Sequence, residues 1–170
     1  MLENLDKVNW VELGAPQVPD LLREIQAHEP GKEFDEKHQE AWHDLIELIF
    51  PQGIIEMWDW SGPGRMMQND LPHKVVLFLL EILEQTTSES TQSEVIGNLR
   101  EMCMYWHISL WVGDPGQPRY KAYVEWASRL KEVIKQGIPI YKQLLYDPYP
   151  RLDPHFDKNA RALLEDLGET

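Results

Sequence analysis

The stretch PHKVVLFLLEILEQ, residues 72–85, decides the fold class of this chain. Its apolar residues recur three and four positions apart, which is the spacing of one face of an α-helix. Phe78 and Leu80 lie beside that face, so the helix is apolar over most of its circumference and should be central. The residues predicted to face inward are Val75, Val76, Leu79, Ile82 and Leu83.

The same period continues on both sides of this segment, and no run of alternating polar and apolar residues indicates a strand. We predict an all-α fold of antiparallel helix pairs in a single domain over residues 1–170. The first two helices should form one pair, the polar stretch 86–93 should be a loop, and the short turn at Gly137 should make a helical hairpin. The predicted helices are residues 18–28, a helix from the Asp35 cap to the break at Pro51, residues 72–85, a helix from a Thr91–Glu94 capping box to Gly113, one from Pro118, one from Pro139, and one capped by Asp153 and opened by Pro154.

The composition fits a globular protein that needs neither disulfides nor metal to fold. Its 29 acidic and 16 basic side chains give a net charge of −13, which disfavours contact with nucleic-acid phosphates. The longest strongly apolar run, residues 75–80, is far below the roughly 20 residues that span a bilayer, and the first residues lack a signal-peptide pattern. We expect a cytoplasmic protein with no nucleic-acid or membrane partner. The sequence does not indicate its oligomeric state.

An apolar residue followed by proline opens three predicted helices, at Val18-Pro19, Leu71-Pro72 and Ile138-Pro139. With Pro51-Gln52-Gly53 and Arg161-Ala162-Leu163-Leu164, these motifs make nearly the whole chain resemble small bacterial HEAT-like proteins. The resemblance implies a right-handed α-α superhelix of about seven helices. Some of these proteins resemble immunity proteins of bacterial toxin systems, which implies a protein partner. The chain departs from the family's pattern between residues 53 and 71.

No spacing of residues indicates catalytic or metal chemistry. His38 and His43 are five positions apart and lie about 140° apart around a helix, whereas two helical metal ligands are typically four apart. Cys103, the one cysteine, lies on the apolar face of its helix and is predicted to be a packed, unreactive thiol. We therefore expect no metal, no cofactor and no enzymatic activity.

A long connection between two predicted helices, residues 53–70, is rich in aromatic and sulfur-containing side chains. Tryptophan, methionine and arginine are enriched at the cores of protein interfaces. Three alternatives stay open for this segment: a partner-binding loop, a plug in the groove between helices, or a wall of a small-molecule pocket. The candidate binding residues are Trp58, Trp60, Arg65 and Met66, with Tyr105 and Trp111 as candidates for the opposite wall of a concave surface.

Negative charge is concentrated in the first third of the chain, where residues 1–60 hold 14 acidic and 4 basic side chains. Four carboxylates recur along the polar side of the predicted helix that follows Asp35, where they would steer a basic protein; they are Glu36, Glu40, Asp44 and Glu47. The favoured function is a non-enzymatic protein-binding module, an immunity or adaptor protein with a basic partner. The alternatives are a small-molecule pocket binder and a HEAT-like enzyme such as a DNA glycosylase.

Overall fold

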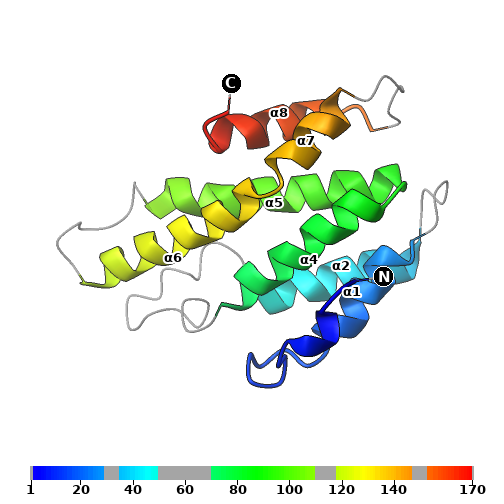
Figure 1. Ribbon diagram of the computed structural model, residues 1–170, viewed down its shortest axis with the longest axis horizontal. Coiled ribbons are helices and arrows are strands. Elements are labelled where there is room, and N and C mark those ends of the chain that lie inside the picture. The colour runs from blue at the N-terminus through cyan, green and yellow to red at the C-terminus, as the bar shows by residue number, and fades with distance from the viewer. Residues whose placement is uncertain (1, 29–34, 50–69, 110–117, 147–152, 170) are drawn as a thin grey trace. The chain divides into compact units, whose positions relative to one another are not determined.

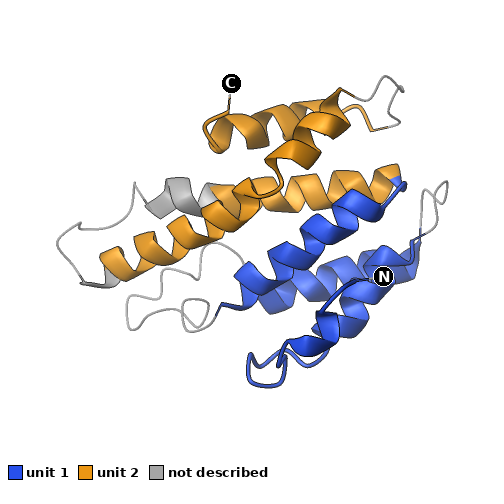
Figure 2. Cartoon of the chain, in the orientation of Figure 1, with its two compact units in different colours: residues 1–88 blue, residues 89–170 orange. Residues whose placement is uncertain are grey.

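The computed structural model describes residues 2–28, 35–49, 70–109, 118–146 and 153–169, with the backbone alone for residues 104–109, 118 and 119. Every regular element in these ranges is a helix, so the all-α prediction is confirmed (Figure 1). The chain divides into two compact units, unit 1 (Met1–Ser88) and unit 2 (Glu89–Thr170), coloured separately in Figure 2. The single-domain prediction over residues 1–170 stays a prediction.

Unit 1 contains the 3₁₀ turn η1 (Leu5–Lys7) and the helices α1 (Val18–Gln26), α2 (Glu36–Ile49) and α4 (Leu71–Gln85). Helix α1 packs against both α2 and α4, and α1 and α2 run in opposite directions, as predicted (Figure 1). Helix α4 buries Phe78 and Leu80 as well as its inward-facing set, which confirms that it is apolar on most sides. Spacing alone was sufficient to predict these helices.

Helix α2 begins where its sequence predicts. The Asp35 carboxylate accepts a hydrogen bond from the backbone N–H of Lys37 at 3.1 Å and lies 3.5 Å from that of His38. This side chain thereby satisfies N–H groups that have no partner inside the first helical turn. The predicted cap is confirmed, and it marks where α2 begins.

The N-terminal segment belongs to the core of unit 1, although it has no helical period. Trp10 is buried, its indole N–H donates to the Leu5 carbonyl at 2.8 Å, and its ring lies 5.7 Å from that of Phe78. Two residues in left-handed conformation, Asn4 and Gly14, bend the chain so that this packing is possible.

Unit 2 contains α5 (Glu89–Ser109), α6 (Pro118–Lys135), α7 (Ile138–Leu145) and α8 (Phe156–Asp166). Helix α5 packs against α6 and α8, and α7 packs against α8. The core combines the apolar faces of these helices and includes Leu99, Trp126 and Phe156.

The predicted loop over residues 86–93 is too long: residues 86–88 connect the two helices, but residues 89–93 are helical. The predicted Thr91–Glu94 capping box is wrong. Helix α5 begins at Glu89, so Thr91 lies inside the first turn, where it is fully buried. A glutamate in the first turn is favourable because it faces the positive end of the helix dipole. The polar residues 89–93 therefore belong to the start of a helix rather than to the loop.

The predicted hairpin at Gly137 is also wrong. Helices α6 and α7 follow each other at a bend, and each packs on a different neighbour, α6 on α5 and α7 on α8 (Figure 1). The buried Tyr141 hydroxyl donates to the Ile134 carbonyl at 2.8 Å, which ties the first turn of α7 to the end of α6. The same carbonyl also accepts from the backbone N–H of Gly137 at 3.0 Å, so it bonds both to the turn and to α7.

The start of α8 differs slightly from the prediction. The Asp153 carboxylate accepts from the backbone N–H of His155 at 2.8 Å, and the helix begins at Phe156. Pro154 therefore lies in the turn before the helix. The predicted inward face is confirmed, because Ala160, Leu163 and Leu167 are buried.

Candidate functional site

The exposed face of α2 is the candidate site that the structure describes. Its acidic residues follow one another at intervals of three and four, which places them within about 80° of each other and along roughly 16 Å of helix. All four are exposed. We call this set the acidic stripe; it consists of Glu36, Glu40, Asp44 and Glu47.

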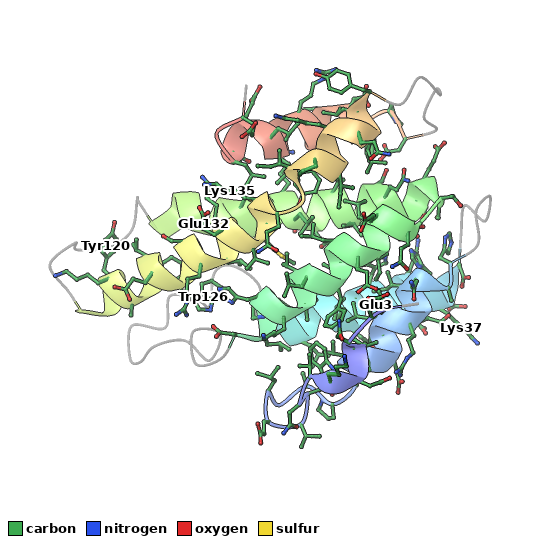
Figure 3. The ribbon with its side chains drawn as sticks, in the orientation of Figure 1. Glu3, Lys37, Tyr120, Trp126, Glu132 and Lys135 are labelled. Atoms are coloured by element: carbon green, nitrogen blue, oxygen red, sulfur yellow. The ribbon has the colours of Figure 1, made fainter. Side chains whose placement is uncertain are left out.

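The opposite face of α2 holds the stripe in place. Trp42, Leu45 and Ile49 are at most 5% exposed and anchor the helix in unit 1. Because the buried and exposed faces are fixed by the same helical period, the stripe faces away from the core. The helix itself carries one basic residue, Lys37, which is exposed near its first turn (Figure 3).

The four carboxylates have no ion-pair partner among the residues that the structure describes. The exposed base of α1 is already neutralised, since Arg23 pairs with Asp6 at 2.6 Å and with Asp20 at 3.1 Å. Like charges four positions apart destabilise a helix by a few tenths of a kcal/mol per pair. The stripe therefore costs stability and leaves its charge available to a partner.

Charge is divided unequally between the two units. Unit 1 carries 17 acidic and 6 basic side chains, a net charge of −11, whereas unit 2 carries 12 acidic and 10 basic ones, a net of −2. In unit 2, Glu132 and Lys135 form an ion pair on α6, with 2.7 Å between Lys135 Nζ and Glu132 Oε1 (Figure 3). The acidic stripe thus lies in the unit that carries most of the net charge.

The aromatic candidates cannot be combined with the stripe into one surface. Trp58, Trp60, Arg65, Met66 and Trp111 lie outside the described residues. Tyr105 belongs to α5, but its side chain is outside the described part. The three alternatives for residues 53–70, a partner-binding loop, a plug between helices and a pocket wall, therefore stay open.

Two further predictions concern reactive side chains. His38 is buried and His43 is exposed on the same helix, so they do not share a site.

Cys103 is 2% exposed. Burial raises the pKa of its thiol to about 12, the Asp166 carboxylate adds to the rise, and Lys131 opposes it. The prediction of a packed, unreactive thiol is confirmed in its packing. Within the described ranges, no three His, Cys, Asp or Glu side chains are grouped to hold a metal ion.

Sequence reasoning missed a buried polar cluster in unit 1. The rings of His28 and His38 stack with their centroids 4.1 Å apart, and Trp42 meets His38 edge-on at 6.2 Å. The signal was present: His38 lies three, four and seven positions before the inward-facing Ala41, Trp42 and Leu45, so the helical period places it on the buried face. We call His28 and His38 the histidine pair.

Among the described helices, none is long and apolar enough to cross a membrane. A comparison with protein-family models found no match, and comparisons with curated proteins and with solved structures found no similar protein. The resemblance to HEAT-like proteins therefore rests on the sequence motifs alone.

Proposed function

We propose that this protein is a non-enzymatic, HEAT-like binding module of the bacterial cytoplasm, an immunity or adaptor protein that captures a basic protein partner through the acidic stripe. The single observation that supports this function is the stripe itself: four exposed carboxylates on one helix face without an ion-pair partner in the described chain. An acidic face of this kind raises the rate at which a basic protein associates.

Helix pairing supports the HEAT-like part of the proposal. Consecutive helices pack as pairs within each unit, α1 with α2, α5 with α6, and α7 with α8. Stacked helix pairs of this kind form extended binding surfaces without a cofactor. The superhelical stacking of these pairs is part of the proposal.

The proposal also includes the aromatic segment as the source of affinity. Electrostatic steering mainly raises association rates, whereas buried aromatic anchors mainly slow dissociation. We therefore assign Trp58 and Trp60 the role of anchors and the acidic stripe the role of attracting the partner. Neither alternative function, the pocket binder or the glycosylase, is favoured by a particular observation in the described residues.

Charge reversal on α2 tests the proposal. An oligolysine peptide serves as the basic probe, and its association rate is measured at low and at physiological salt. Glu40→Lys with Glu47→Lys should slow association by roughly tenfold at low salt and flatten its salt dependence. The variant should fold at least as well as the natural chain, because the new lysines relieve repulsion along the helix and pair with Glu36 and Asp44.

A matched control separates the stripe from net charge. Glu125→Lys with Glu165→Lys changes the charge by the same amount at two exposed positions of unit 2. This control should change the association rate by less than about threefold. Equal losses in both variants would show that only overall charge matters and would refute the acidic stripe as a binding surface.

A further inference from the structure

The histidine pair joins the end of α1 to the start of α2. His28 follows the last turn of α1, and His38 lies in the first turn of α2. The two residues are 7% and 4% exposed, and their ring planes are inclined by 34°. Two imidazole rings stacked at 4.1 Å out of water are compatible with at most one positive charge, because like charges at this distance repel strongly where the dielectric is low.

Hydrogen bonds fix the state of His38. The Trp42 indole N–H donates to Nε2 of His38 at 3.1 Å, so this nitrogen must be unprotonated. In the neutral ring the proton is then on Nδ1, which is buried and has no hydrogen-bond partner in the described chain. A second proton on Nε2 would break the bond to Trp42 and place two N–H groups against each other.

The surroundings of His38 also oppose a positive charge. The ring lies at the N-terminal end of α2, where the helix dipole is positive. The groups whose charge acts on it are His28, which follows α1, and Asp35, which caps α2. Ser88, which follows α4, contributes only a hydroxyl, 2.9 Å from Nδ1 of His28. Residues 29–34, which connect the two helices, lie outside the described residues.

The net effect of these surroundings is to disfavour a positive charge on His38. Burial lowers the pKa of His38 to about 4, the neighbouring His28 adds to the decrease, and the Asp35 carboxylate opposes it. In the unfolded chain the same group titrates near 6.5. Between these two values the unfolded state binds more protons than the folded state, so stability falls as the pH falls through this range.

We infer that the histidine pair, with Trp42 and Ser88, is an acid-sensitive latch that holds the start of α2 against the end of α1 while the His38 ring is neutral. Because the open state binds a proton on His38 more readily than the stacked state does, acidification opens the α1–α2 pair. Because the acidic stripe lies on α2, opening also removes the rigid support of that surface. The latch itself does not depend on the proposed binding function.

The first test measures amide hydrogen exchange in the full chain at pH 7 and pH 4.5, corrected for intrinsic exchange rates. In the natural protein the protection of α1 and α2 amides should fall by roughly 50-fold more than in His38→Leu, which has no titrating ring at this position. The amides of α5 and α8 serve as an internal reference, and His43→Leu, at an exposed position of the same helix, should behave like the natural protein. His73 is buried on α4, and its Nδ1 lies 3.8 Å from the Asp70 carboxylate. Because His73 is present in all three proteins, its contribution to the pH dependence cancels in the comparison.

The second test needs no variant and decides the question if His38→Leu fails to fold. Ring-nitrogen chemical shifts of the natural protein should show His38 as the Nδ1–H tautomer at pH 7, and its titration should occur at least one pH unit below 6.5. An Nε2–H tautomer, an ordinary titration near 6.5, or equal pH dependence in the natural protein and His38→Leu would each overturn the latch.

Discussion

Single residues show where the helical period carries chemical information and where it does not. Tyr141 was expected to face inward from its spacing, and it does. Its hydroxyl bond to the Ile134 carbonyl was not predictable, because that bond depends on the angle between α6 and α7 rather than on either helix alone. The same holds for His38: its burial follows from the helical period, but its stacking on His28 depends on how α1 packs against α2.

Removing the Tyr141 hydroxyl should measure what the bend between α6 and α7 contributes. In Tyr141→Phe the Ile134 carbonyl keeps the bond from the Gly137 N–H but loses the hydroxyl donor, which should lower the free energy of unfolding by about 1 kcal/mol. Urea denaturation at neutral pH gives this value. Tyr146→Phe is the matched control, since it removes the same atom from a side chain that is 81% exposed and should change stability by less than about 0.5 kcal/mol. Equal effects would show that the hydrogen bond contributes nothing to the bend.

At the level of helices, spacing was enough to predict type and inward face, but not every boundary or neighbour. Helices α1, α2 and α4 begin within a residue of their predicted starts because proline or aspartate marks each one. Helix α5 begins earlier than predicted because its first turn consists of polar residues, some of which are buried. Composition alone does not distinguish such a turn from a loop. The N-terminal segment was missed because a 3₁₀ turn and left-handed residues leave no period to detect.

The Asp35 cap should be the main local determinant of where α2 begins. Asp35→Ala removes the acceptor for the first-turn N–H groups and should lower the free energy of unfolding by about 1 kcal/mol at pH 7. Asp44→Ala makes the same change in the middle of the helix, at an exposed position where like charges repel. Its stability should be unchanged or slightly higher by chemical denaturation. A stable Asp35→Ala protein would mean that packing of the Trp42 face alone fixes the start of α2.

The whole molecule combines two compact units of similar size but very different charge, −11 in unit 1 and −2 in unit 2. The sequence predicted the acidic first third, but the division at Ser88 depends on which helices pack together and has no marker in composition. Most of the candidate anchors lie in segments without a helical period, for which spacing makes no prediction. Charge distribution is therefore the property of the whole chain that sequence reasoning describes best.

This imbalance predicts that salt stabilises the two units unequally. Carboxylates in unit 1 repel each other at low ionic strength, and the Debye length shortens from about 30 Å at 0.01 M to about 4 Å at 0.5 M, which screens that repulsion. Hydrogen exchange on the full chain should then show the opening free energy of core amides in α1, α2 and α4 rising by about 1 kcal/mol over this range. Core amides of α5 and α8 should change by less than half as much, because acids and bases nearly balance in unit 2. Sucrose, an uncharged stabiliser, is the control and should protect both units alike. An equal response of both units to sodium chloride would show that the excess charge of unit 1 is too dispersed to repel itself, and electrostatic steering by the acidic stripe would lose its physical basis.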